Sequence, residues 1–180
     1  MVNQEPVIIT EVCPRDGFQS IHEWIPTETK VDIINQLMDC GYQQIEVTSF
    51  VHPKAIPQLK DADEVLTKIK RSKQVKLRAL VPNLRGLERA IAVGVDKAKL
   101  MLSASDSHSL SNANCTTEEA LQQFEPLIAR AQESAIDISG SISVAFGCPY
   151  EGDVPVERLV MICTRYRAFG IQEISLADTT

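Results

Sequence analysis

The chain has 180 residues, a length that suits one domain with a sizeable core. Hydrophobic residues make up 44% and charged residues 23%, and the net charge is -6 with a pI of about 5.1. This acidic balance argues against a nucleic-acid partner or an anionic membrane surface, since both attract clustered lysine and arginine. No run approaches the ~18 consecutive apolar residues of a membrane span, so we expect no membrane partner.

The five cysteines are scattered and form no Cys-x-x-Cys pair. We therefore expect neither a disulfide framework nor a structural zinc site, and free thiols indicate a reducing compartment. Residues 1–6 are polar and carry no apolar signal segment. We expect a cytoplasmic protein, although a mitochondrial matrix protein after processing would look the same.

Short apolar runs alternate with longer amphipathic ones along the chain. In chain order, the pattern predicts a strand at 7–12, a helix at 27–40, a strand at 44–48, a helix at 62–70, a strand at 75–81, a helix at 84–93 and a strand at 97–102. It continues with a helix from 116 or 117 to about 135, a strand at 141–146, a helix at 156–169 and a strand at 173–176. Gly41, Gly94 and Gly170 stop three of these helices.

This alternation of strands and helices indicates a parallel sheet with right-handed crossovers. Two architectures compete, the open doubly wound sheet and the closed eight-stranded barrel. No Gly-x-Gly-x-x-Gly follows the first strand, which disfavours a dinucleotide-binding doubly wound sheet. Polar residues instead follow successive strand ends, and in a barrel these positions converge at one mouth. We therefore predict an α/β fold of the TIM (β/α)8 type.

The length of the chain does not fit a whole barrel. Such a barrel takes ~250 residues, whereas the pattern gives six strands and the chain stops after the sixth. We expect residues 1–180 to be the N-terminal portion of a single catalytic barrel, with strands seven and eight absent. The first and sixth strands would then be unpaired edges.

Two adjacent opposite charges, Arg15 and Asp16, follow Pro14 at the end of the first strand. An aspartate at a barrel mouth suits Mg²⁺, which takes oxygen ligands and keeps positions open for substrate. The arginine can stabilise negative charge that develops on a carbonyl or enolate oxygen. The alternative is a structural ion pair, with Gly17 completing the turn.

A carboxylate, Glu46, lies inside the second predicted strand. Period-2 alternation places Glu46 and Thr48 on one face of the strand, opposite the apolar side chains of Ile45 and Val47. A buried carboxylate needs a partner, so we predict an ion pair with Arg15. An exposed acid on a surface strand is the alternative.

Other polar residues give weaker indications. Asp178 follows the sixth strand and fits a general base or a group that orients a metal ligand, with a helix cap as the alternative. Asn112 can donate amide hydrogen bonds to a substrate or make a turn. No two of the three histidines have metal-ligand spacing, and His108 is expected to be a solvated loop side chain. Cys148 is expected to pack within a turn.

Five segments of the chain form a familiar pattern. They are Glu11-Val-Cys-Pro-Arg-Asp-Gly-Phe-Gln19, Ile45-Glu-Val-Thr-Ser-Phe-Val-His-Pro-Lys54, Leu80-Val-Pro-Asn-Leu-Arg-Gly86, Phe146-Gly-Cys-Pro-Tyr-Glu-Gly152 and Glu173-Ile-Ser-Leu-Ala-Asp-Thr179. Together they resemble the hydroxymethylglutaryl-CoA lyase family of the DRE-TIM metallolyases, in register over essentially the whole chain. The Arg-Asp-Gly turn indicates only the superfamily, whereas the second and fourth segments are more specific to the lyases.

The resemblance implies a role for each matching residue. Asp16 would be a ligand of Mg²⁺ or Mn²⁺, Arg15 would stabilise an enolate, Glu46 would support Arg15, and Asp178 would take part in proton transfer. Residues near the metal or the acyl group would be Gln19, Asn112, Ser175 and Thr179. The implied reaction is a retro-Claisen cleavage of a 3-hydroxy-3-methylglutaryl-CoA-like thioester to acetyl-CoA and acetoacetate. Family members serve leucine catabolism and ketone-body metabolism and are commonly homodimers.

The chain departs from the family in two ways that bear on function. It ends before the His-x-His metal ligands of the seventh strand, so by itself it is expected to bind Mg²⁺ poorly and not to turn over. The fifth strand of the lyases usually carries an Arg-x-Tyr pair facing the substrate, where this chain has Ser139 and Ser141. The serines favour a related aldolase or Claisen synthase acting on another acyl-CoA or a 2-oxo acid. An inactive fragment is the third possibility.

Overall fold

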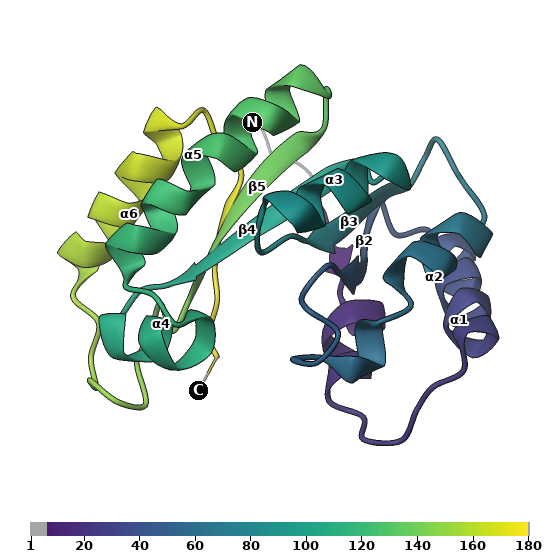
Figure 1. Cartoon of the computed structure of the whole chain (residues 1–180), viewed down its shortest axis with the longest axis horizontal. Coiled ribbons are helices and arrows are strands. Elements are labelled where there is room, and N and C mark those ends of the chain that lie inside the picture. The colour runs from purple at the N-terminus through teal and green to yellow at the C-terminus, as the bar shows by residue number, and fades with distance from the viewer. Residues whose placement is uncertain (1–6, 180) are drawn as a thin grey trace, which may run out of the picture.

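The computed structural model describes residues 7–179 of the chain. Its six strands form one sheet in which every neighbouring pair is parallel. They are β1 (Thr10–Glu11), β2 (Gln44–Ser49), β3 (Lys76–Leu80), β4 (Lys97–Ser103), β5 (Asp137–Ser143) and β6 (Ile174–Leu176). The strands lie side by side in chain order, so every crossover advances in the same direction (Figure 1). Right-handed crossovers of this kind put the helices on one side of the sheet, as in a β/α barrel.

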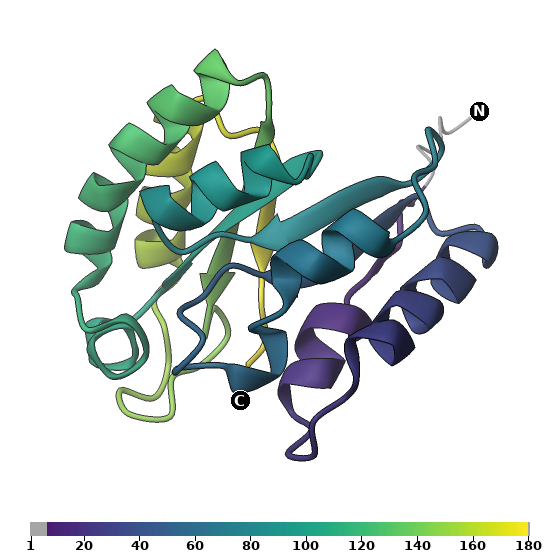
Figure 2. The same ribbon diagram turned by 45° about the vertical axis from the view of Figure 1, so that its right-hand side comes forward.

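The helices cover one side of this sheet. They are α1 (Thr27–Asp39), α2 (Ala62–Lys68), α3 (Leu84–Ala92), α4 (Asp106–Ala113), α5 (Thr117–Glu133) and α6 (Val156–Ala168), with a π-helical turn η1 (Cys13–Gly17) and a 3₁₀ turn η2 (Pro57–Leu59). Figures 1 and 2 show α1, α2, α3, α5 and α6 along the outside of a curled sheet, which confirms the predicted TIM-barrel type of fold with six strands. Within residues 7–179, every helix is too short or too polar to cross a lipid bilayer.

Local sequence explains where the longest helix begins. The hydroxyl of Thr116 accepts a hydrogen bond from the amide of Glu119, and the Glu119 carboxylate accepts one from the amide of Thr116 at 2.7 Å. This reciprocal capping box satisfies two amides that the first turn of a helix leaves unpaired. It makes Thr116 the cap and Thr117 the first helical residue of α5.

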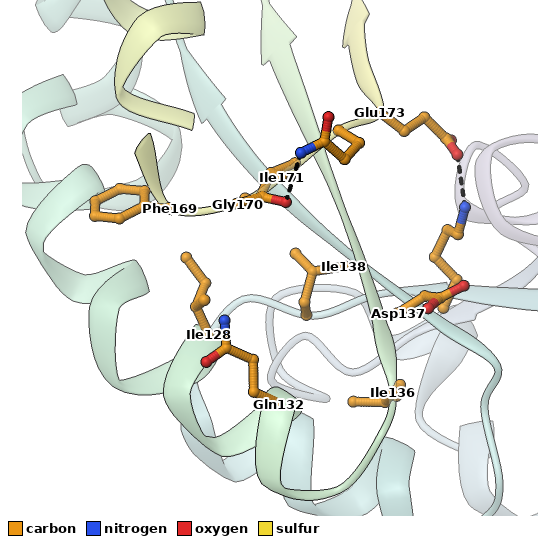
Figure 3. Close-up of a pocket in the computed structure, with 11 residues that line it drawn as sticks. Ile128, Gln132, Ile136, Asp137, Ile138, Phe169, Gly170, Ile171 and Glu173 are labelled. Carbon is orange, nitrogen blue, oxygen red and sulfur yellow. Dashed lines mark hydrogen bonds and ion pairs between the residues drawn. The ribbon is translucent and has the colours of Figure 1, made fainter. Parts of the chain in front are cut away.

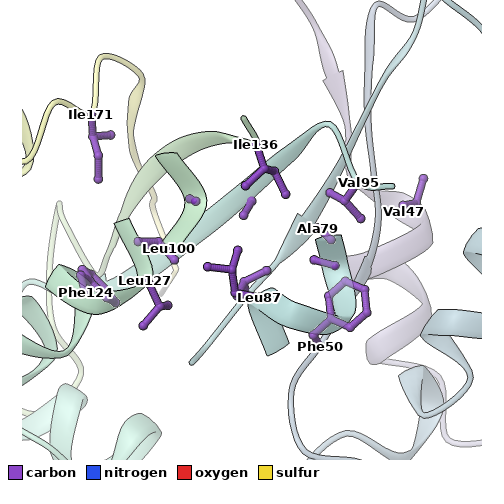
Figure 4. Packing of buried hydrophobic residues seen from close by; sticks show 14 of the residues in the cluster. Val47, Phe50, Ala79, Leu87, Val95, Leu100, Phe124, Leu127, Ile136 and Ile171 are labelled. Atoms are coloured by element: carbon purple, nitrogen blue, oxygen red, sulfur yellow. The ribbon is translucent and has the colours of Figure 1, made fainter. Parts of the chain in front are cut away.

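The two faces of the sheet carry different side chains. On the outer face, apolar residues of the strands join those of the helices in one core, where Figure 4 shows Leu100 and Ala79 with Leu87 and Leu127. The inner face carries buried polar and charged side chains at alternating positions. These are Gln44, Glu46, Arg78, Lys97, Ser103, Ser139, Ser141 and Ser143. The helical layer therefore supplies the hydrophobic core, and the inner face is free to carry polar chemistry.

The fifth strand begins four residues earlier than predicted. The apolar run at 141–146 suggested the strand, but β5 starts at Asp137 and pairs with β4 over its whole length. Gly140 has a packing role there, because a Cβ at this position would lie 3.1 Å from the ring of the buried Tyr166. The strand ends where Val144 adopts a φ of 50°, a left-handed conformation that valine rarely takes.

The first strand is shorter than predicted. A strand is predicted at 7–12, but only Thr10 and Glu11 pair with β2, and the apolar Val7 is 88% exposed. Within the described residues, β1 and β6 form the two edges of the sheet, as predicted. An apolar run at an edge has no second strand to bury its side chains, so the ladder there is short.

Candidate active site at the carboxyl end of the sheet

The π-helical turn η1 directly follows β1 and carries the Arg15-Asp16 pair. Its amides at Arg15 and Asp16 both donate to the carbonyl of Val12, at 3.0 and 2.7 Å, and Pro14 is buried beneath them. A single π turn is uncommon and frequently lies at a functional site. The tight turn presents both charged side chains at the carboxyl end of the sheet, which is the end where barrel enzymes hold their catalytic groups.

A cluster of three charged side chains, here called the mouth cluster, lies beside this turn. Arg15 Nε donates to Glu46 Oε1 at 2.5 Å, and Lys99 Nζ donates to Glu46 Oε2 at 3.1 Å. Glu46 is only 1% exposed, so its charge is balanced by two cations from different elements. The predicted ion pair between Glu46 and Arg15 is confirmed. Lys99 was not singled out from the sequence, although lysines at alternate positions of an otherwise apolar strand were visible there.

A bulge in β2 lies next to Glu46. The register of β2 against β3 shifts between Glu46 and Thr48, so that Glu46 is aligned with Arg78 but Thr48 is aligned with Ala79 of the hydrophobic core. The prediction that Thr48 shares the face of Glu46 is therefore wrong, because the extra residue ends the simple alternation. Bulges occur often beside active sites, where they redirect a side chain.

The Asp16 side chain is 60% exposed, and its Oδ1 accepts from Arg15 Nη1 at 2.6 Å. An exposed carboxylate at the end of a strand is chemically suited to a hard divalent cation, which proteins hold through one or two carboxylates together with water and substrate oxygens. Across residues 7–179, no group of three or more histidine, cysteine, aspartate or glutamate side chains is placed to hold a metal ion. Asp16 thus fits as one ligand of Mg²⁺, and the described residues do not supply a complete set.

The residues predicted after the sixth strand lie at the same end of the sheet. Asp178 is exposed, and within the described part of the chain its side chain makes no hydrogen bond. The hydroxyl of Thr179 accepts a bond of 2.7 Å from the amide of Val144, and the hydroxyl of Ser175 donates to the carbonyl of Gly140 at 3.4 Å. The Thr179 bond therefore joins the segments that follow β5 and β6, and the Ser175 bond joins the two strands in their middle. The side chain of Asp178 is exposed beside them.

The two remaining predicted residues lie on either side of the mouth cluster. Gln19 is exposed just beyond η1 and lines a surface pocket with Trp24 and Lys60. Asn112 is exposed on the helix α4, where the sequence predicts a loop. The hydroxyl of Ser105 caps this helix, a signal that was present in the sequence.

Helix α4 also corrects the prediction for His108. The Nδ1 atom of His108 lies 2.7 Å from the hydroxyl of Ser103 at the end of β4, and the side chain is partly buried. His108 is therefore not a solvated loop residue. A helix directly after a strand brings its first turn back onto the strand end. The pairing of His108 with Ser103 follows from that geometry.

The Cys148 turn packs against the start of α4. Cys148 and Gly152 exchange two backbone hydrogen bonds of 2.8 Å, and the thiol lies 2.9 Å from the Ser105 hydroxyl. Burial alone would raise the pKa of the Cys148 thiol, but hydrogen bonds from Ser105 and from the amides of Tyr150 and Glu151 outweigh it and lower that pKa. The thiol is buried, so the structure agrees with the prediction that Cys148 packs within a turn.

A second charged group, here called the floor cluster, lies nearer the amino ends of the strands and directly beside the mouth cluster, since Arg78 is the register partner of Glu46. Arg78 Nη1 donates to Glu173 Oε1 at 2.5 Å, and Lys97 Nζ donates to Glu173 Oε2 at 2.6 Å. Arg78 also donates to Gln44 and, through Nη2, to the hydroxyl of Ser139 at 2.8 Å. The buried guanidinium therefore joins β2, β3 and β5 near their amino ends.

A surface pocket lies at this end of the strands. Figure 3 shows Glu173 and Asp137 on one side of it and Ile128 and Phe169 on the other. It is built from the amino ends of β4 and β5 and from the segments that precede β5 and β6. Catalytic groups of barrel enzymes lie at the carboxyl ends, so this pocket is not the candidate active site.

Comparison with known proteins agrees with the fold and with the resemblance. The HMGL-like family model matches residues 6–180. The hydroxymethylglutaryl-CoA lyase YngG of Bacillus subtilis is 46% identical over 173 residues, which are 96% of this chain and 58% of the relative. The cytoplasmic 3-hydroxy-3-methylglutaryl-CoA lyase of Danio rerio is 42% identical over 96% of this chain and 52% of its own length. The chain thus spans about half the length of the curated relatives it matches.

Solved structures of HMG-CoA lyases have the same fold as this chain. The crystal structure of the Bacillus subtilis HMG-CoA lyase superposes with a TM-score of 0.94, covering 96% of this chain and 58% of that one. An HMG-CoA lyase from Acinetobacter baumannii, in complex with coenzyme A and 3-methylmalate, is 40% identical with a TM-score of 0.93 and is covered over 56% of its length. A family match that runs from residue 6 to the last residue, on the same fold, shows that this chain belongs to the HMGL-like family.

Proposed function

We propose that the chain forms the N-terminal part of a carbon–carbon lyase that cleaves 3-hydroxy-3-methylglutaryl-CoA to acetyl-CoA and acetoacetate. The observation that carries the proposal is the Arg15–Glu46 pair, a cation held at the carboxyl end of the sheet by a carboxylate that is 1% exposed. The names of the relatives support the substrate, since those of Bacillus subtilis and Danio rerio are lyases of this thioester.

The reaction needs a proton acceptor at the tertiary hydroxyl and stabilisation of the enolate that forms when the carbon–carbon bond breaks. Asp178 is the proposed acceptor, because its carboxylate is exposed at the end of β6. Arg15 is the proposed enolate stabiliser, since a guanidinium donates to an oxyanion and stays charged at any working pH. Glu46 keeps Arg15 in place. Arg15 and Asp178 would then act on the same substrate, at the ends of β1 and β6.

A divalent cation, Mg²⁺ or Mn²⁺, is part of the proposal. When bound, it would chelate oxygens of the substrate and make the hydroxyl more acidic. Asp16 would contribute one carboxylate to it, and Arg15 would then be released from its contact with Asp16 towards the substrate. Gln19 and Asn112, both exposed, are the proposed contacts of the acyl-CoA, with Ser175 and Thr179 shaping the mouth.

A second candidate function follows from the inner face of β5. Ser139 and Ser141 are both buried there, where a larger pair faces the substrate in the lyases the chain resembles. A different acyl group would suit the smaller side chains. The alternative is therefore an aldolase or Claisen synthase of the same superfamily acting on another acyl-CoA or a 2-oxo acid.

The cellular compartment and the oligomeric state are also part of the proposal. Its scattered thiols fit a reducing compartment, and relatives carry both cytoplasmic and mitochondrial names. We expect the cytoplasm, and a homodimer as the resemblance implies. Light scattering of the purified chain tests the oligomer directly.

The activity is tested on a fusion protein, here called the completed protein. It joins this chain, in register, to the C-terminal part of the Bacillus subtilis lyase that this chain does not match. With Mg²⁺ and 3-hydroxy-3-methylglutaryl-CoA, we expect release of acetyl-CoA and acetoacetate in equal amounts, lost in Arg15→Gln. A panel of other thioesters and 2-oxo acids distinguishes this lyase from the alternative aldolase or Claisen synthase. Turnover of a panel member but not of this thioester would reject the lyase, and turnover of none would reject both enzymes.

A further inference from the structure

Lys99 is a partly buried charge of the mouth cluster that the proposed mechanism does not use. It is the third residue of β4, on the same inner face as Lys97, and its side chain is 13% exposed. Its Nζ lies 3.1 Å from Glu46 Oε2, the carboxylate oxygen that Arg15 Nε does not contact. The two cations therefore hold Glu46 from different elements, Arg15 from η1 and Lys99 from β4.

The neighbours of Lys99 leave room for its long side chain. Its register partner on β5 is Ser139, and its partner on β3 is Leu80. Ser139 and Ser141 are both small and buried, and Arg78 of β3 reaches Ser139 across the inner face. Lys99 extends the other way, over β3 to Glu46 on β2.

Charge balance shows what Lys99 changes. Arg15 and Glu46 alone would form a neutral pair, and the carboxylate would cancel most of the field of the guanidinium at short range. Asp16 adds a second carboxylate beside Arg15, so without Lys99 the group would carry one negative charge; with Lys99 on the second oxygen of Glu46, the four charges balance. Arg15 is the member of this cluster on the turn at the carboxyl end, so Lys99 removes a net negative charge from the place where the proposed enolate forms.

We propose that Lys99 is a positioning residue of the mouth cluster, which fixes Glu46 and offsets one of the two carboxylates beside Arg15, the group that faces an anionic reaction intermediate. The part of this inference that concerns turnover rests on the proposed lyase function. The part that concerns Arg15 is a property of the chain itself. The two parts are measured separately.

The first experiment compares Lys99→Met, Lys99→Arg and Lys97→Met in the completed protein. Lys97 is the matched control, since it lies two residues away on the same face and contacts Glu173 of the floor cluster. We expect Lys99→Met to lower kcat by about 10²-fold, because displacing a group that stabilises the transition state by about 1 Å has that effect. KM should change little, Lys99→Arg should recover most of kcat, and Lys97→Met should keep it.

The second experiment needs no turnover and uses the 180-residue chain. NMR of the Arg15 Nε–H group, with arginine labelled by ¹⁵N, reports how firmly this group is bonded to Glu46. We expect its hydrogen exchange to be faster in Lys99→Met and unchanged in Lys97→Met. Unchanged exchange in Lys99→Met, or equal losses of kcat in Lys99→Met and Lys97→Met, would overturn the proposal. An inactive completed protein would reject the lyase function and leave the exchange measurement to decide the role of Lys99.

Discussion

The mouth cluster and the floor cluster have the same composition and opposite arrangements. Each places one glutamate between two cations on the inner face of the sheet. In the mouth cluster the glutamate is the buried member, 1% exposed, and Arg15 is presented at the open end. In the floor cluster Arg78 is buried and the side chain of Glu173 is 41% exposed.

This inversion agrees with the proposal that the mouth cluster is functional and the floor cluster structural. A buried carboxylate can hold a cation out towards a ligand, which suits Arg15. A buried guanidinium with partners on several strands joins those strands, which suits Arg78. Composition alone therefore does not distinguish the two clusters. They differ in their position relative to the strand ends and in which member is buried.

The largest effect on folding is expected when the buried anion is removed. Glu46→Gln leaves two cations without their carboxylate in a desolvated site, which costs about 3–5 kcal/mol of unfolding free energy. Chemical denaturation of the 180-residue chain measures it, with Glu173→Gln as the matched control. If the two variants lost equal stability, the deeper burial of Glu46 would not make it more important for folding than Glu173.

A smaller loss is expected when the buried cation of the floor cluster is removed. Arg78→Met breaks the bonds to Gln44, Glu173 and Ser139, but Lys97 still pairs with the partly exposed Glu173. We expect a loss of about 2–3 kcal/mol, below that of Glu46→Gln, because no charge is left buried and unpaired. The same denaturation experiment checks it, and a loss above that of Glu46→Gln would reverse the order.

A substitution on the outer face provides a control for destabilisation alone. Gly140→Ala places a methyl group 3.1 Å from the ring of Tyr166, whose hydroxyl donates to the carbonyl of Ser141. Overpacking of this kind costs about 1–3 kcal/mol. Below its melting temperature the completed Gly140→Ala protein should keep its kcat. Loss of kcat at full folding would mean that any disturbance of β5 reaches the mouth cluster.

The smallest effect concerns the pH dependence of stability at the floor cluster. Burial would raise the pKa of Glu173, but its bonds to Lys97 and Arg78 dominate and lower that pKa. A lowered folded pKa means that Glu173 stabilises the fold above its unfolded value of about 4.3 and loses this contribution as the pH falls through the folded pKa. Because the side chain is partly exposed, the contribution is less than about 1 kcal/mol.

Melting temperatures measured from pH 7 down to pH 3 check this prediction. The unchanged chain should be more stable than Glu173→Gln near pH 7, and the two should converge as the pH falls. A difference that stayed constant over the whole range would show that the Glu173 charge does not contribute through its titration.

Much of the fold followed from periodicity. The alternation of apolar and amphipathic runs predicted the six strands, their parallel pairing and all helices of the outer layer except the short α4. Helix α4 was missed because its residues are polar and its packing depends on the end of β4. The start of β5 was missed because serine and glycine are poor strand formers, and their burial is decided by Tyr166 from a distant helix.

The site followed from the sequence only in part. The Arg15–Glu46 pair was predicted because a buried carboxylate needs a partner on a neighbouring element. The contacts of Lys99 and Arg78 were not predicted. Whether a long cationic side chain lies along the inner face depends on the side chains of neighbouring strands, which the local sequence does not show. The roles of Arg15, Asp16, Asp178 and the four proposed substrate contacts stay predictions.

The most direct test of the account compares Arg15→Lys with Arg78→Lys in the completed protein. Both changes keep the positive charge, but lysine cannot reach Glu46 and Asp16 together as Arg15 does through Nε and Nη1. We predict that Arg15→Lys lowers kcat by about 10²-fold with a small change in melting temperature, while Arg78→Lys lowers the melting temperature and keeps kcat. Full activity in Arg15→Lys, or an equal loss of kcat in Arg78→Lys, would contradict the assignment of catalysis to the mouth cluster and of structure to the floor cluster.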